Sequence, residues 1–255
     1  MAANDEGVDD PSEAAVSEGD AADAGAVDPA TLPEDVDTET GARGAVYALL
    51  ARAFAEPDEE LYAALDDGTV DRECAALLKH SGLDVAPPDL SVAEDREDLS
   101  ARFNDLFVIG YSEVVDKTDG TVHNEGPPVS LYESDYRPDV SWNDVNLDLA
   151  RAYEYFGVQV DEDVRRNHDH LKLVLEFAGF LCRREAAVDP AVAPARLDFH
   201  DRHLRVFAEG LADALETEPG TGLYGRLGDF LDRFSAADVD DLAARQEAGE
   251  WEGRS

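Results

Sequence analysis

An all-α fold, a compact single-domain helical bundle of about nine or ten helices, is what this sequence predicts, and three observations carry that prediction. Apolar residues recur at spacings of three and four over most of the chain after residue 39. Pro, Gly and capping residues interrupt the pattern too often for long coiled-coil heptads. No convincing pair of strands and no tandem repeat stands out. We therefore expect one all-helical domain over 39–255.

Residues 1–38 differ sharply from the rest of the chain. They are rich in Asp, Glu, Ala and Gly, contain no Lys or Arg, and have almost no large apolar side chains. Such a segment cannot bury enough apolar surface to offset the entropy lost on ordering. We expect a disordered acidic tail over 1–38.

Four helices are expected in the first half of the domain. Their apolar positions and flanking residues place them at about 40–56, 58–67, 69–82 and 91–107. Pro57 ends the first helix and Gly68 follows the second. Thr69 is expected to cap the third, and Ser91 with Glu94 forms a capping box for the fourth. Residues 110–130, rich in Gly and Pro, are predicted to form a long loop.

The second half predicts five more helices. Ser141 with Asp144 opens one that stops at Gly157, and Asn167 caps the next, which ends at Asp189-Pro190. A long helix over about 194–216 is broken by Pro219-Gly220. Two short helices, at 222–234 and 236–247, are expected to close the chain.

The charge excludes some classes of partner. Lys plus Arg number 21 and Asp plus Glu number 59, which gives a formal net charge of −38. Such a field repels nucleic-acid phosphates and anionic membrane surfaces, so we expect neither nucleic-acid binding nor stable membrane association. Arg-rich, Lys-poor acidity of this kind resembles the proteins of salt-in halophilic archaea, because molar salt screens like charges. Acidity as a habitat trait is then no evidence for a basic partner.

The location follows from what the chain lacks. No apolar run approaches the length that spans a membrane, and the N-terminus lacks the basic and apolar regions of a signal peptide. Cys74 and Cys182 lie in apolar helical stretches and read as small buried hydrophobes, without a CxxC spacing. We expect a cytoplasmic protein.

The chemistry-bearing residues argue against an enzyme. Phosphate-binding glycine loops and the GxSxG nucleophile motif are missing. His168-Asp169-His170 opens an otherwise apolar helix, where Asp169 alone is explained by capping. One alternative is an HD-type all-α metal-dependent phosphohydrolase using His168 and Asp169, with His80 or His123 upstream. His200 and His203 could be ligands or merely form a polar helix face. No catalytic residue, metal or cofactor is expected.

A second segment, Leu131 to Tyr136, directly follows the long loop. Tyr132 and Tyr136 offer flat apolar area with a polar tip, which suits peptide recognition, although tyrosines packed on the core are the plainer interpretation.

Several motifs in order resemble the TorD/DmsD/NarJ-type redox-enzyme maturation chaperones, over about 43–235. The matching segments are Ala45–Phe54 followed by Pro57-Asp58, Phe103–Phe107, Leu131–Tyr136, Asp169-His170 with Leu175–Phe177, and His203-Leu204 with Phe207. Two departures stand out. Arg166 and Asn167 occupy places where the family often has Glu-Pro, and Leu131 stands where it often has Pro.

The resemblance implies a chaperone without catalytic activity. Such proteins bind the apo catalytic subunit of a molybdenum-cofactor oxidoreductase, often at its twin-arginine signal peptide, and delay export until the cofactor is inserted. Such a chaperone needs a groove between its helices that offers apolar contacts to the signal peptide and hydrogen-bond acceptors for the arginines of that peptide. The residues expected to form it are Leu106, Phe107, Leu131, Tyr132, Glu133, Ser134, Tyr136, Asp169 and His170. A helical adaptor for an unrelated partner remains the other alternative.

Overall fold

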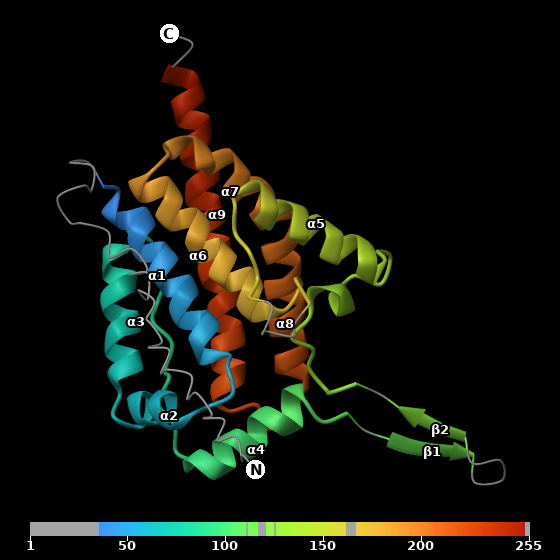
Figure 1. Ribbon diagram of the computed structural model, residues 1–255. Helices are drawn as coiled ribbons and strands as arrows, with labels where there is room; N and C mark the ends of the chain where they lie inside the picture. The colour runs from blue at the N-terminus through green and yellow to red at the C-terminus, as the bar shows by residue number, and fades with distance from the viewer. Residues whose placement is uncertain (1–35, 111, 117–120, 125, 162–166, 253–255) are drawn as a thin grey trace, which may run out of the picture. The chain divides into compact units, whose positions relative to one another are not determined.

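The computed structural model describes residues 36–110, 112–116, 121–124, 126–161 and 167–252. The described chain is helical apart from one short hairpin (Figure 1). Its helices are α1 (Thr38–Ala53), α2 (Glu59–Asp66), α3 (Thr69–His80), α4 (Arg96–Phe107), α5 (Trp142–Tyr155), α6 (Leu171–Ala187), α7 (Ala193–Phe199), α8 (Arg205–Thr217) and α9 (Leu223–Glu252). The all-α prediction is confirmed.

Two of these helices form one continuous rod. A π-helical turn, η4 (His200–Leu204), joins α7 directly to α8, as the single helix expected over 194–216 implies. Within the described residues, the nine α-helical segments therefore form eight separate helices, and this number is slightly below the expected nine or ten. None of the described helices is both long enough and apolar enough to cross a membrane.

Three predicted helix starts were wrong by a few residues. Asp89 accepts hydrogen bonds from the backbone and hydroxyl of Ser91, so Ser91 is used in a turn and Asp95 caps α4 instead. The N-cap of α6 is His170 rather than Asn167. Gly68, with φ of 71°, precedes Thr69, which is the first residue of α3.

Two further expectations were wrong. Helix α9 is continuous where two short helices were predicted. Within it, Ser235 donates its hydroxyl to the Asp232 carbonyl. Part of the predicted 110–130 loop forms an antiparallel hairpin, β1 (Ser112–Asp116) with β2 (Thr121–Asn124). The missed signal is a run of valines flanking Asp119-Gly120, a dipeptide that favours hairpin turns.

The expected acidic tail mostly lies outside the described residues. Its last residues do not: Asp37 caps α1 by accepting hydrogen bonds from the backbone of Glu39 and Thr40. The Asp37 amide also donates to the Ala186 carbonyl at the end of α6.

Helices α1 and α6 form the most extensive helix pair of the bundle. They cross where two glycines face each other. A Cβ on Gly44 would lie 2.9 Å from the Gly179 carbonyl oxygen, and a Cβ on Gly179 would lie 2.8 Å from that of Gly44. No other residue type fits at either position without moving a backbone, so this pair sets how closely the helices approach.

A buried group of charged residues joins four helices, as a polar insertion in an otherwise apolar core. Asp238 of α9 lies 3.3 Å from Arg43 of α1 and 2.8 Å from Arg196 of α7, and it accepts a 2.9 Å hydrogen bond from the Tyr47 hydroxyl. Arg196 also pairs with Glu185 of α6 at 2.6 Å. All five side chains are buried. Charges so deeply buried are tolerated only when each is paired.

Replacing Asp238 should therefore destabilise the fold strongly. Asp238→Asn leaves Arg43 and Arg196 without their shared buried anion, and we expect the free energy of unfolding to fall by roughly 3–5 kcal/mol. Asp240→Asn, at an exposed position of the same helix, should change it by less than about 0.5 kcal/mol. Urea unfolding followed by circular dichroism measures both, and equal stabilities would contradict the proposed importance of this group.

The two cysteines should be unreactive in the folded protein. Both are buried, as the sequence predicted, and burial raises the pKa of each thiol to about 12. Because the thiolate is the reactive form, a thiol-specific reagent at about pH 8 should label neither cysteine until urea unfolds the chain. Rapid labelling of either one under native conditions would show that its helix opens.

Candidate partner-binding site

The two segments singled out in the sequence meet in the fold, although 33 or more residues separate them. Tyr132 and His170 form an isolated antiparallel bridge. The Glu133 amide donates to the Asp169 carbonyl at 3.0 Å, and the Leu171 amide donates to the Leu131 carbonyl at 2.8 Å. The 131–134 segment thus pairs with the residues that lead into α6.

A carboxylate closes this pairing. Asp169 Oδ2 accepts hydrogen bonds from the Ser134 hydroxyl at 2.6 Å and the Ser134 amide at 3.2 Å. We call this arrangement the Asp169–Ser134 clasp. Asp169 is fully buried, and its other oxygen, Oδ1, has no hydrogen-bond partner among the described residues. The clasp fixes the segment before α5 to the start of α6.

Tyr132 and His170 pack against each other beside the clasp. Their ring centroids lie 5.1 Å apart with the planes at 86°, an edge-to-face contact. His170 Nδ1 accepts from the Lys172 amide and so caps α6. Tyr132 is half-buried whereas His170 is buried, so Tyr132 is the ring of this pair that reaches solvent.

The side chain of Glu133 points to a different partner. It is fully buried, on the 3₁₀ turn η2 (Glu133–Tyr136), and contacts Arg137 at 2.6 Å and His203 Nδ1 at 3.0 Å. His203 Nε2 lies 3.3 Å from Asp148 of α5. His203 therefore lies between two carboxylates, one on η2 and one on α5.

His200 and His203 were expected either to be metal ligands or to form a polar helix face, yet both are buried. The signal was present in the resemblance, which includes His203-Leu204, but spacing alone could not show that Glu133 lies opposite.

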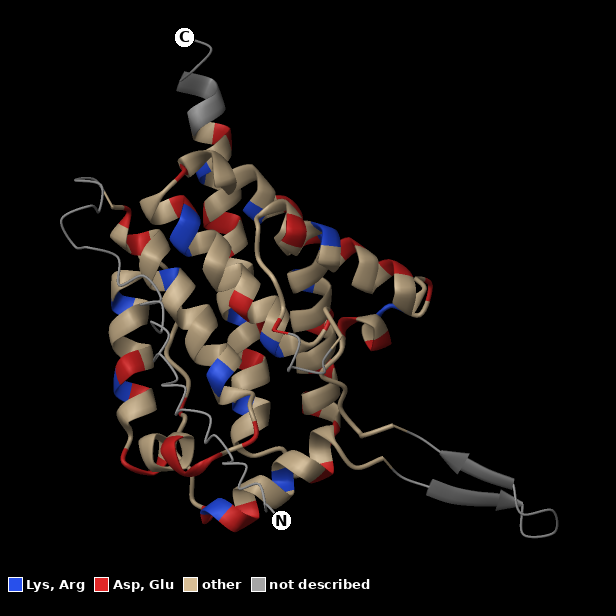
Figure 2. Cartoon of the chain, viewed as in Figure 1, with Lys and Arg blue, Asp and Glu red and all other residues tan. Residues whose placement is uncertain are grey.

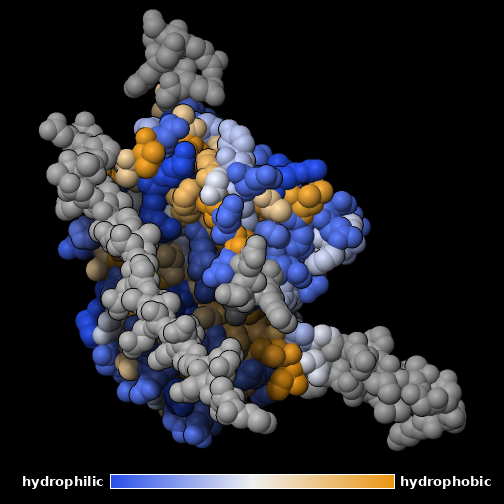
Figure 3. Space-filling view, viewed as in Figure 1, coloured by the Kyte–Doolittle hydropathy of each residue, from blue (hydrophilic) through white to orange (hydrophobic). Residues whose placement is uncertain are grey.

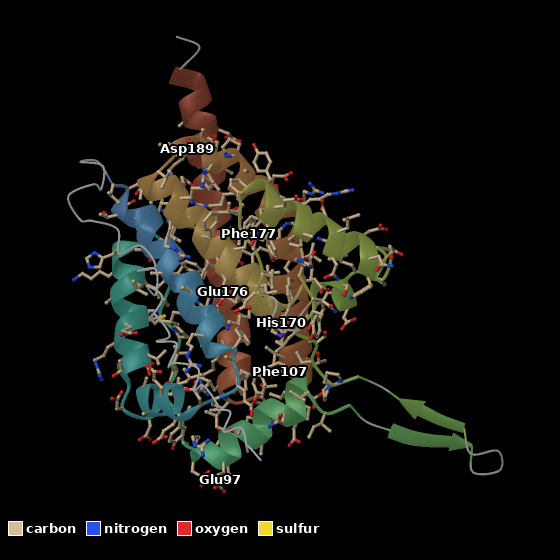
Figure 4. The ribbon with its side chains drawn as sticks, in the orientation of Figure 1. Glu97, Phe107, His170, Glu176, Phe177 and Asp189 are labelled. Atoms are coloured by element: carbon tan, nitrogen blue, oxygen red, sulfur yellow. The ribbon has the colours of Figure 1, made fainter. Side chains whose placement is uncertain are left out.

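The remaining predicted residues have other partners. Tyr136 donates its hydroxyl to the Ser130 carbonyl and packs on Phe207, and burial raises its pKa. Leu106 and Phe107 are buried in the core, where the Phe107 ring contacts Phe54, Phe103 and Tyr224. Figure 4 labels Phe107 at the end of α4 and His170 at the start of α6. The fold brings Tyr132, Ser134, Asp169 and His170 together, with Leu131 and Glu133 beside them through the backbone.

The site's acidity acts on a neighbouring tyrosine. Burial raises the pKa of Tyr153 well above its usual value, and the nearby Glu133 and Asp169 raise it further. Its hydroxyl donates to the His168 carbonyl at 3.0 Å. Tyr153 therefore serves as a neutral hydrogen-bond donor that holds the turn before α6.

The described side chains offer little support for the alternative of a metal-dependent phosphohydrolase. Among the described side chains, no group of three or more His, Cys, Asp and Glu is arranged to hold a metal ion. Asp169 is engaged with Ser134, and His80 lies exposed at the end of α3. The side chain of His123 lies outside the described part of the chain.

Comparison with known proteins identifies relatives of one kind. A selenate reductase assembly chaperone protein from Thauera selenatis is 38% identical over 41% of this chain, which spans 58% of that relative, less than two thirds of its length. A chlorate reductase assembly chaperone protein from Ideonella dechloratans is 31% identical over 73% of this chain and 84% of its own. A perchlorate reductase assembly chaperone protein from Dechloromonas aromatica is 27% identical over 79% and 90%.

The family profile covers the part of the chain that carries both motifs. The profile described as nitrate reductase delta subunit matches residues 52–213, which include the 131–136 segment, the clasp and His203. This is more than half of the 255 residues, and it agrees with the resemblance to the TorD/DmsD/NarJ-type proteins. The chain belongs to the nitrate reductase delta subunit family.

Proposed function

We propose that this protein is an assembly chaperone for the catalytic subunit of a molybdenum-cofactor oxidoreductase of the DMSO reductase/nitrate reductase group. It binds the subunit before the cofactor is inserted, acts in the cytoplasm and catalyses no reaction. The observation that carries this proposal is the family match over 52–213. It is supported by three relatives whose names describe assembly chaperones of oxyanion reductases.

The clasp supports the proposal as a positioning device. Asp169 and Glu133 are fully buried, so neither is free to pair with a partner's arginine at the surface. Their hydrogen bonds instead fix the backbone that carries half-buried Tyr132. We propose that Tyr132 contacts the client, and that the twin-arginine signal peptide is part of what is bound.

The acidic residues of this chain attract an arginine-bearing segment, but acidity that is also a habitat trait is no evidence that the client carries arginines. The net charge is −38, and acidic residues outnumber basic ones along the helices (Figure 2). In molar salt this attraction acts only over a few ångströms, so apolar contacts must supply most of the affinity.

The client should be recoverable with the full-length chain. Affinity purification from the native cells, followed by mass spectrometry, should recover the catalytic subunit of a molybdoenzyme that lacks its cofactor. Deleting the gene should leave that reductase with little molybdenum, because the apo subunit is then unprotected before loading.

The matched control for this experiment is a deletion strain that carries the intact gene on a plasmid. Full molybdenum content of the reductase in the uncomplemented deletion strain would contradict an assembly role. Co-purification of an unrelated protein in its place would favour a helical adaptor.

The clasp should behave as one coupled unit in stability measurements. Asp169→Ala leaves the half-buried Ser134 hydroxyl and amide without their acceptor and should lower the free energy of unfolding by roughly 1–3 kcal/mol. Ser134→Ala in that background should add little, so the double-mutant cycle should show a coupling of about 1 kcal/mol.

Asp139→Ala, at an exposed position of the loop before α5, is the control for charge removal. Its stability should stay within about 0.5 kcal/mol of the wild type, measured by urea unfolding. Additive effects of the Asp169 and Ser134 changes would mean that the two side chains do not act together.

A further inference from the structure

A groove with a volume of about 360 Å³ lies between α5, α6 and α7. Its apolar floor combines three aromatic rings, Phe156, Phe177 and Phe199, with Leu181 and Ala152. The Phe177 ring contacts Phe156 at 5.9 Å and Phe199 at 5.0 Å between centroids. Figure 4 labels Phe177 along α6. Phe177 and Phe199 are themselves buried, so the part of this floor that reaches solvent is formed mainly by Phe156 and its neighbour Tyr155.

Exposed apolar side chains on α5 extend this floor. Leu147 and Tyr155 are eight residues apart, so they share one stripe of the helix with Arg151 between them. Tyr155 lines the groove and is 82% exposed, while Leu147 is 48% exposed. Figure 3 shows apolar surface over α5 among hydrophilic residues. A tyrosine exposed to this degree gains by being covered.

The lip of the groove already holds an arginine. The guanidinium of Arg202 bonds to Asp148 of α5 and lies 3.5 Å from Asp198 of α7. The Arg202 side chain is 52% exposed, and an ion pair so open to solvent is worth little. These two carboxylates are thus spaced to bind a guanidinium group, and the chain's own arginine is easily displaced.

The groove is connected to the clasp through one residue. His203 lines the groove and contacts both Asp148 on its lip and Glu133 on η2. His203 and Arg202 lie on the π-turn η4, a distortion that is often found at functional sites. The buried motif residues thus hold the wall of an exposed groove in place.

We propose that the α5/α6/α7 groove is the surface that receives an amphipathic helical segment of the client, with its apolar face on Phe156 and Tyr155 and an arginine replacing Arg202 between Asp148 and Asp198. This inference rests on the proposed chaperone function. It adds where the client lies on the chaperone and which features of the client the chaperone recognises. Asp169, Glu133 and His203 are positioning residues, because they are buried and their contacts hold backbone and groove wall in place.

Binding can be tested with a defined probe. The probe is a fluorescein-labelled amphipathic peptide of about 18 residues with a Leu/Phe face and two arginines on its edge, titrated by anisotropy in molar KCl. Tyr155→Ala should weaken binding about tenfold, because it removes an exposed apolar contact of the groove. Trp142→Ala, a 50% exposed aromatic on the same helix that does not line the groove, should leave it unchanged.

A second pair of variants tests the role of the arginine. Arg202→Ala frees Asp148 and Asp198 and should tighten binding about threefold or more. Arg205→Ala makes the same change of charge two positions beyond His203, the last residue of the groove lining, and should have no such effect. A peptide with glutamates in place of its arginines should lose both the affinity and the difference between these variants.

Photo-crosslinking separates failure of this inference from failure of the proposed function. A photoreactive residue at Tyr155 should crosslink the co-purified catalytic subunit, while one at Val188, which is 71% exposed outside the groove, should not. If the subunit co-purifies but crosslinks equally at both positions, the groove is overturned and the chaperone function stands. If no subunit co-purifies, the proposed function fails. Absence of peptide binding, or equal affinities for Tyr155→Ala and Trp142→Ala, overturns the groove.

Discussion

Asp238 is the group on which the arrangement of the helices depends. Its carboxylate is buried between two arginines and a tyrosine, so α1, α7 and α9 can be packed only in an arrangement that brings all three to it. Arg196 extends the constraint to α6 through Glu185. The start of α6 carries the Asp169–Ser134 clasp, and α7 forms one wall of the groove. The buried ion pairs thus help to fix the α7 wall of the groove, because Arg196 lies between Ala195 and Asp198, which line it.

Helix positions were readable from the sequence because apolar spacing and breakers act locally. Gly157, with φ of 71°, ends α5 where it was expected. Caps were less certain, because several short polar residues lie near one helix start: Asp89 accepts from the Ser91 amide in a turn, and Asp95 accepts from the Asp98 amide as the cap of α4. The contact between Gly44 and Gly179 could not be predicted from local patterns, because a side chain is excluded at each position only by the backbone of the other helix.

The sequence predicted which residues meet at the candidate site, but it did not predict which of their side chains are buried. Tyr132, Ser134, Asp169 and His170 do meet, but polar character alone does not tell a residue that faces a partner from one that holds a backbone in place. Asp169 and Glu133 are polar and fully buried, because Ser134 and His203 satisfy them from distant parts of the chain. Long-range partners of this kind are what a single sequence leaves open.

The π-turn at His200–Leu204 determines what the loss of one residue from this helix would do. Such a turn holds one residue more than the α-helical register needs, and its wider turn absorbs that residue. A one-residue deletion there would restore a regular α-helix and leave the Phe207 and Leu211 face of α8 in the core, but it would change the direction in which His203 leaves the helix and so its contact with Glu133. The extra residue therefore serves the pairing of His203 with Glu133 and not the packing of α8.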